Sequence, residues 1–162
     1  MSKTTNLSMT RPFSGIKVLY LILTIAGSIE PWFWLLQDPC QLDVTDPESM
    51  TRLAAQMEQA YGRLDILVNN AGILYDTWQQ PSTADFDTMQ EAIDTNTLGP
   101  WRMCKAFAPL LRRSQHGRII NVSSGAGSIA SMDNSTPAYS VSKAALNAFT
   151  RSLAAELNGT GI

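Results

Sequence analysis

The sequence predicts an α/β fold with a parallel sheet flanked by helices, and three observations lead to that prediction. Short runs of branched apolar residues at 64–68 and 118–122 are typical of buried strands. Helical spacing of apolar residues separates and follows them, at residues 47–61, 85–113 and 137–157. Strands that alternate with helices in this way indicate a parallel sheet with crossover connections.

Composition limits the classes of function. The chain has 162 residues, 44% of them hydrophobic and 16% charged, which fits one globular domain. A net charge of −2 argues against a nucleic-acid partner, because such a partner needs a basic face. The two cysteines form neither a disulfide framework nor a metal-ligand spacing, so we expect a cytoplasmic protein without a metal site.

The first 41 residues depart from this pattern, and we treat them as an atypical N-terminal segment ahead of an α/β domain at residues 42–162. The apolar run at residues 17–26 has three interpretations. It can be a first buried strand, the core of a signal peptide, or the start of a membrane span that residues 30–31 interrupt. We favour the strand and expect no membrane association.

Within the domain, Leu42-Asp43-Val44 predicts the end of a short strand. The next helix starts near Pro47 and runs to about Tyr61, where a glycine ends it. The long 85–113 helix contains Gly99 followed by proline, which predicts a bend there.

Polar residues follow each predicted strand. In a parallel sheet the carboxyl ends of the strands meet at one edge, and ligands bind beyond that edge. This rule brings Asp43, residues 69–72 and residues 123–127 to the same edge. It also puts the start of the 137–157 helix within reach of Ser124.

Tyr139 and Lys143 occupy positions i and i+4 of that helix, so their Cβ atoms lie on one face, roughly 5–6 Å apart. A cation beside a phenol favours the phenolate, which makes the hydroxyl a better proton donor near neutral pH. Thr136 can cap the helix, and Pro137 suits its first turn. By itself the pair also fits a surface tyrosine beside a solvated lysine, so its meaning depends on the other motifs.

Four motifs in this order resemble the short-chain dehydrogenase/reductase family. They are Asn69-Asn70-Ala71-Gly72, Asn96 within Asp94–Gly99, Ser123-Ser124, and Tyr139-x-x-x-Lys143. The resemblance extends from Leu42 to Ile162. It implies a Rossmann-like sheet and an NAD(P)-dependent oxidoreductase that reduces a carbonyl or oxidises an alcohol.

The resemblance also implies a role for each motif residue. Tyr139 would be the general acid/base, Lys143 its activator, Ser124 the hydrogen-bond donor to the substrate oxygen, and Asn96 a relay residue in a bent helix. The residues expected to bind the cofactor are Asp43, Val44, Asn70, Ala71, Gly72, Tyr139 and Lys143. The cofactor would be NADP or NAD, with NADP favoured, and the substrate a small-molecule carbonyl or alcohol.

The sequence departs from the family pattern at both ends. Residues 24–31, where the family has a glycine-rich phosphate loop, contain one glycine, and too few residues precede Leu42 for a complete first βαβ unit. The chain ends at Ile162, before the strands that follow the tyrosine helix in the family. We therefore expect a partial Rossmann-like sheet that lacks an intact first βαβ unit and the C-terminal strands.

Two further expectations follow from the resemblance and these departures. Helices 85–113 and 137–157 pair across a dimer interface in the family, so we expect a homo-oligomer, which would also cover the apolar side of the second helix. The alternative to an active enzyme is a catalytically inactive remnant that acts through association with other subunits.

Overall fold

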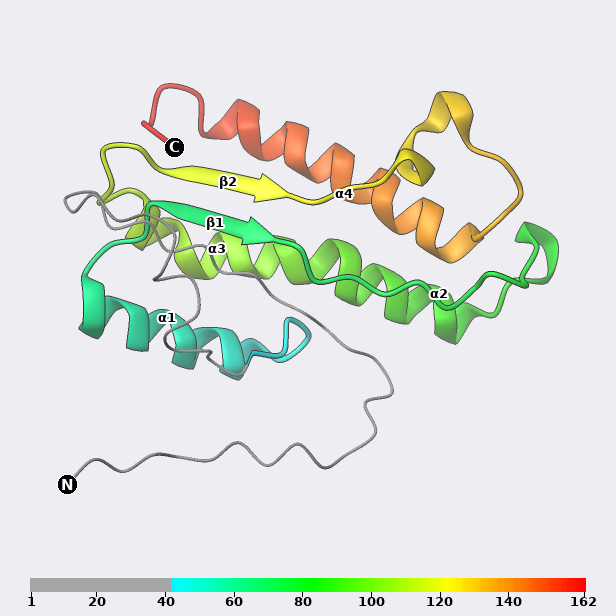
Figure 1. The fold of residues 1–162 in the computed structure, drawn as a ribbon, viewed down its shortest axis with the longest axis horizontal. Coiled ribbons are helices and arrows are strands. Elements are labelled where there is room, and N and C mark those ends of the chain that lie inside the picture. The colour runs from blue at the N-terminus through cyan, green and yellow to red at the C-terminus, as the bar shows by residue number, and fades with distance from the viewer. Residues whose placement is uncertain (1–41) are drawn as a thin grey trace, which may run out of the picture.

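The computed structural model describes residues 42–162, in which a two-stranded parallel sheet is covered by helices (Figure 1). The α/β class with parallel pairing, predicted from the sequence, is confirmed. The predicted strand at residues 17–26 lies outside the described residues. The elements are α1 (Pro47–Tyr61), β1 (Ile66–Asn69), α2 (Phe86–Ile93), a π-helical turn (Asp94–Leu98), α3 (Gly99–Leu111), β2 (Arg118–Asn121) and α4 (Pro137–Glu156).

Short 3-10 turns lie in the two loops that follow the strands. One spans Pro81–Thr83 after β1, and two span Gly125–Gly127 and Ile129–Ser131 after β2. Within residues 42–162, no helix is both long enough and apolar enough to cross a bilayer.

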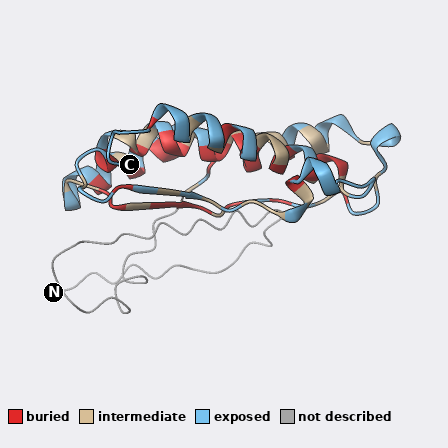
Figure 2. Cartoon of the chain, turned by 90° about the horizontal axis from the view of Figure 1, so that it is seen from above, coloured by how far each residue is buried: buried red, intermediate tan, exposed pale blue. Residues whose placement is uncertain are grey.

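The strands pair with Leu67 opposite Ile119 and Val68 opposite Ile120. Successive residues of a strand face opposite sides of the sheet. Ile119 therefore packs against the core, whereas Ile120 is 48% exposed. The four α-helices lie on one face of the sheet, and their buried residues are turned toward the strands (Figure 2).

The hydrophobic core fills the space between the strands and the helices. Helix α3 lies between α1 and α4 in Figure 1 and supplies Phe107 and Leu111, both with 0% exposure. Leu67 of β1, Met50 of α1 and Leu146 of α4 complete the centre of this cluster. The strands and helices are thus held together mainly by burial of apolar surface.

Helix α1 begins and ends as the sequence predicts. The Asp46 side chain accepts the backbone N–H of Glu48 at 2.9 Å, and Pro47 occupies the first turn, where no N–H is needed. The helix ends at Gly62, whose φ of 72° lies in the left-handed region that glycine adopts without strain.

The predicted strand end at residues 42–44 is wrong, because these residues form a loop that leads into a turn. The Asp43 carboxylate accepts the N–H of Thr45 at 2.8 Å and its hydroxyl at 2.7 Å. Asp and Thr side chains that bond the local backbone compete with a strand ladder, which explains the difference.

The long 85–113 helix is interrupted one turn before the predicted bend. Pro100 has no N–H to offer the carbonyl of Asn96, and the Gly99 N–H bonds instead to Asp94 O, five residues back. The result is the π turn that carries Asn96, a residue with 0% exposure. Gly99 also allows close packing, since a Cβ there would lie 3.0 Å from Val44 Cγ2.

Replacing Phe107 with alanine tests the core. We expect the free energy of unfolding to fall by about 3–5 kcal/mol, because the whole ring is buried and a cavity remains. Phe86→Ala removes the same atoms from a ring that is 80% exposed, so its effect should stay within about 0.5 kcal/mol. Urea unfolding followed by circular dichroism measures both, and equal losses would contradict the packing of α3.

Candidate active site

The two strands end beside α4, and side-chain amides connect them to each other and to this helix. The Asn69 side chain donates to Asn121 Oδ1 at 2.8 Å, and the Asn121 side chain donates to Thr150 Oγ1 of α4 at 2.9 Å. The Val122 N–H also bonds to Asn69 O at 2.9 Å. Asn69 stands in the first motif without a role predicted from the sequence, and the structure shows that its side chain connects the two strands.

Lys143 is attached to the end of β2. Its amine donates to the Val122 carbonyl at 2.8 Å, and the residue is only 4% exposed. Burial lowers the pKa of this amine below the usual lysine value, because loss of water disfavours the ammonium form. Lys143 Nζ lies 5.7 Å from the centre of the half-buried Tyr139 ring. The structure therefore brings the predicted pair together.

Asn96 joins the loop after β1 to α4. Its Oδ1 accepts the Ile73 N–H at 2.8 Å, and its Nδ2 donates to Ile73 O and to Ser142 Oγ, both at 2.9 Å. Its neighbour Thr97 donates its hydroxyl to Ser142 O at 2.8 Å. Two consecutive residues of the π turn thus hold the same residue of α4.

Gly72 lies close to the side chains of Asn96 and Lys143. A Cβ at this position would lie 3.3 Å from Asn96 Oδ1 and 3.5 Å from Lys143 Nζ. Gly72 itself is exposed, Asn70 is half-buried and Ala71 packs into the core. The absence of a side chain at Gly72 therefore lets this loop pack closely against Asn96 and Lys143.

Ser124 lies in the loop after β2, and its Oγ accepts the Ala126 N–H at 3.2 Å. Gly127, at the end of that turn, is pressed against α4: a Cβ there would lie 2.8 Å from the carbonyl carbon of Lys143. The Asn147 side chain also donates to Gly127 O at 3.2 Å. The loop that carries Ser124 is thus held against the helical turn that carries Lys143.

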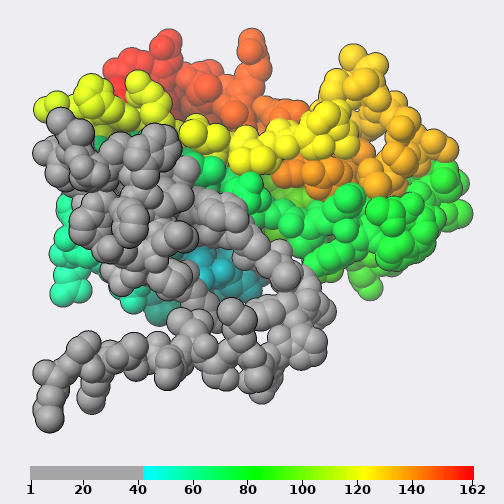
Figure 3. All heavy atoms as spheres, in the orientation of Figure 1, coloured from blue at the N-terminus to red at the C-terminus, as the bar shows by residue number. Residues whose placement is uncertain are grey.

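The two loops after the strands lie side by side in the space-filling view. The chain that follows β2 (yellow to gold) runs along the chain that follows β1 (green), and the first part of α4 (orange) is visible between them (Figure 3). This arrangement agrees with the contacts of Asn96 and Gly127 with α4. Ser123 Oγ is buried and has no hydrogen-bond partner among residues 42–162.

Asp43 and Val44, predicted to meet the adenine ring, lie apart from this cluster. Val44 is 2% exposed and packs into the core against Gly99, while the Asp43 carboxylate bonds to Thr45. Their role in binding a cofactor stays a prediction.

The predicted cap of α4 is wrong. Thr136 has a left-handed backbone, with φ of 45°, and its side chain makes no capping hydrogen bond. Asp76 accepts the N–H groups of Ala138 and Tyr139 instead. Sequence reasoning missed Asp76, because its only signal is an acidic residue in the loop that follows Gly72.

The sequence model of the short chain dehydrogenase family matches residues 36–162, and the chain belongs to this family. It is 42% identical to the (+)-neomenthol dehydrogenase of Arabidopsis thaliana over 110 residues, 58% of this chain and 37% of that enzyme. It is 34% identical to the 3-oxoacyl-[acyl-carrier-protein] reductase FabG of Escherichia coli over 121 residues, 75% of this chain and 48% of that reductase.

Solved structures show the same relationship. Carbonyl reductase Sniffer of D. melanogaster superposes with a TM-score of 0.72 and 31% identity, over 75% of this chain and 54% of that one. The NADPH-bound carbonyl reductase from chicken fatty liver superposes with a TM-score of 0.71 and 33% identity, over 76% of this chain and 53% of that one. The predicted family and the Rossmann-like α/β class are confirmed. The chain spans less than half the length of the two curated relatives.

Gly127→Ala tests the close contact between the serine loop and α4. We expect the free energy of unfolding to fall by about 1–3 kcal/mol, because the added Cβ would meet backbone atoms of Lys143 that cannot move aside. Gly125→Ala is the matched control, since no atom lies within 4 Å of its Cβ, and its effect should stay within about 0.5 kcal/mol. Urea unfolding measures both variants, and equal effects would contradict this contact.

Proposed function

We propose that this chain is an NAD(P)-dependent oxidoreductase that reduces a carbonyl or oxidises an alcohol with Ser124, Tyr139 and Lys143. The observation that carries the proposal is the buried Lys143 amine, which lies 5.7 Å from the centre of the Tyr139 ring. In this proposal the Tyr139 hydroxyl gives a proton to a substrate oxygen or takes one from it. A cytoplasmic location, which the cysteine content favours, is part of the proposal.

Reduction of a carbonyl requires a hydride at carbon and a proton at oxygen. Bound NAD(P) would supply the hydride, and the Tyr139 hydroxyl would supply the proton. The Ser124 hydroxyl would donate to the same oxygen as negative charge develops there. No hydrogen bond among residues 42–162 uses the Ser124 hydroxyl hydrogen, which is consistent with this role. In the oxidation direction, Tyr139 would accept the proton of the alcohol.

The residues around Gly72 fit a dinucleotide. A group bound over the exposed backbone of Gly72 would lie near the Lys143 amine, a donor suited to a ribose hydroxyl. In this proposal Asn70 and Ala71 flank that position, and Asp43 and Val44 serve the adenine end. NADP is favoured over NAD, because the similar carbonyl reductase from chicken fatty liver is described as NADPH-bound.

Tyr139→Phe tests the proposal, because it removes only the hydroxyl oxygen. We expect kcat to fall about 10²- to 10⁴-fold, the usual contribution of a general acid, and the Kd for NADPH to rise far less, because Tyr139 is only one of the residues expected to contact the cofactor. Tyr61→Phe, on the exposed side of α1, should leave both values unchanged. Nicotinamide absorbance follows oxidation of neomenthol and reduction of 3-oxoacyl thioesters and small ketones, and nicotinamide fluorescence gives the Kd.

Two results would contradict this function. Turnover that survives unchanged in Tyr139→Phe would remove Tyr139 from the mechanism. Wild-type protein that shows no saturable binding of NADPH or NADH would favour the alternative, an inactive family member that associates with other subunits.

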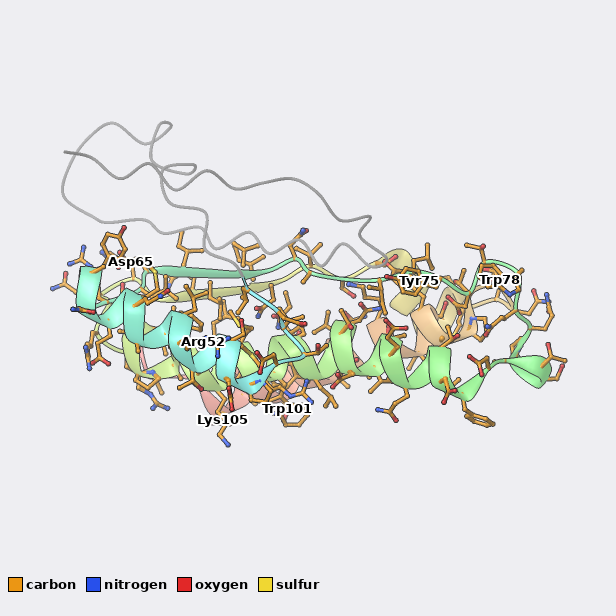
Figure 4. All side chains as sticks on the ribbon, turned by 90° about the horizontal axis from the view of Figure 1, so that it is seen from below. Arg52, Asp65, Tyr75, Trp78, Trp101 and Lys105 are labelled. Atoms are coloured by element: carbon orange, nitrogen blue, oxygen red, sulfur yellow. The ribbon has the colours of Figure 1, made fainter. Side chains whose placement is uncertain are left out.

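We also propose that α3 and α4 pair with a second copy of the chain. Trp101 is 52% exposed, points away from the sheet in Figure 4, and stacks on Phe149 of α4 with ring centres 4.5 Å apart. Val141 of α4 is 43% exposed. Apolar surface of this kind often marks an interface between proteins.

Trp101→Glu tests the pairing. A carboxylate at this position would be buried without a partner in the interface, so we expect a shift from dimer to monomer in sedimentation velocity. Trp78→Glu, at an exposed tryptophan in the loop after β1, is the control and should keep the association state of the wild type. A wild type that sediments as a monomer at micromolar concentration would argue against this interface.

A further inference from the structure

We propose that Asp76 is a positioning residue for Tyr139: it caps α4 from the loop after β1 and so keeps Tyr139 beside Lys143. The inference rests on the function proposed above, in which Tyr139 transfers the proton. It adds a residue outside the four motifs that identify the family.

The carboxylate of Asp76 meets the first turn of α4 directly. Its Oδ2 accepts the N–H of Ala138 at 2.6 Å and the N–H of Tyr139 at 3.3 Å, and the residue is 1% exposed. The first N–H groups of a helix have no acceptor within the helix. A carboxylate suits them, because charge-assisted hydrogen bonds are strong and because negative charge is favourable at a helix N-terminus.

Thr136, the residue just before the helix, does not supply an acceptor for the N–H groups of Ala138 and Tyr139. Thr136 has the left-handed values φ 45° and ψ 56°, and its hydroxyl lies 3.3 Å from Ser140 Oγ rather than on a backbone N–H. Pro137 has no N–H, so Ala138 and Tyr139 are the first residues of the helix that need an acceptor. Left-handed backbone is strained for threonine, so surrounding contacts must maintain it, and Asp76 bonds the backbone two and three residues further on.

The backbone N–H and the backbone carbonyl of Tyr139 are both hydrogen-bonded to side chains. Its N–H bonds to Asp76, and its carbonyl accepts the hydroxyl of Ser142 at 2.7 Å. Ser142 is in turn bonded to Asn96, which binds Ile73 of the same loop as Asp76. The loop after β1 therefore holds α4 directly at Ala138 and Tyr139, and at Ser142 through Asn96.

The contacts of Asp76 matter because Lys143, the residue paired with Tyr139, is attached elsewhere. Lys143 is bonded to Val122 at the end of β2, a contact that does not involve the first turn of the helix. The position of the Tyr139 ring relative to that amine then depends on the first turn of α4. A displacement of about 1 Å in a catalytic geometry can lower the rate about 100-fold.

Two substitutions separate the charge of Asp76 from its hydrogen bonds. Asp76→Asn keeps an acceptor oxygen without the charge, and Asp76→Ala removes both. We expect kcat to fall roughly 10-fold in the first variant and roughly 100-fold in the second, with the Kd for NADPH within about two-fold of the wild type. Assays are run well below the unfolding temperature of each variant, so that the fraction folded does not change.

Asp46→Ala is the matched control. It removes the cap of α1, where Asp46 accepts the Glu48 N–H at 2.9 Å, on a helix that carries no site residue. It should lower stability by about 1 kcal/mol, the usual effect of losing a cap, and leave kcat unchanged. If Asp76 only stabilised the fold, Asp76→Ala would likewise lower stability and leave kcat unchanged.

NMR of the free protein gives a readout that needs no turnover. In the wild type we expect slow amide exchange at Ala138 and Tyr139, and nuclear Overhauser effects between the Tyr139 ring and the Lys143 side chain. In Asp76→Ala both signals should be lost, while the buried amides of Phe107 and Leu111 in α3 stay protected.

Each outcome decides a different question. Slow exchange at Ala138 in Asp76→Ala would rule out the cap. Full kcat, or unchanged ring-to-lysine Overhauser effects, in that variant would rule out positioning. A wild type without turnover would refute the proposed function, and the Overhauser comparison would then decide this inference by itself.

Discussion

The hydrogen bond from the Lys143 amine to the Val122 carbonyl is the interaction on which the rest of the site depends. A buried amine is costly unless it finds an acceptor, and this carbonyl lies just beyond the last paired residue of β2, Asn121. The bond fastens the second turn of α4 to the carboxyl edge of the sheet. Tyr139, one turn earlier on the same helix face, comes to that edge with it.

Three other segments are arranged around this attachment. The π turn contributes Asn96, whose amide reaches both the loop after β1 and Ser142 of α4. The loop after β2 approaches the Lys143 backbone closely, because Gly127 has no side chain to keep it away. Tyr139 and Lys143 thereby lie at the carboxyl edge of the sheet, beside the loops that follow β1 and β2.

Much of the secondary structure could be predicted because its signals are local. Asp46, Pro47 and Gly62 mark the ends of α1 by chemistry confined to a few residues, and apolar runs mark β1 and β2. The errors arose where a local signal competed with another contact. The turn hydrogen bonds of Asp43 replaced a strand, and a carboxylate from a distant loop took the place that Thr136 was expected to occupy.

The sequence by itself determined the α/β class, the family, and the presence of Tyr139 and Lys143 on one helix face, because helical periodicity alone sets the relation between positions i and i+4. Only the tertiary structure decided what each residue of that pair contacts. The Lys143 bond to Val122 spans 21 residues, the Asn96 bond to Ser142 spans 46, and the Asp76 bond to Ala138 spans 62. No periodicity or short motif encodes such pairs, since they form only when packing brings separate segments together.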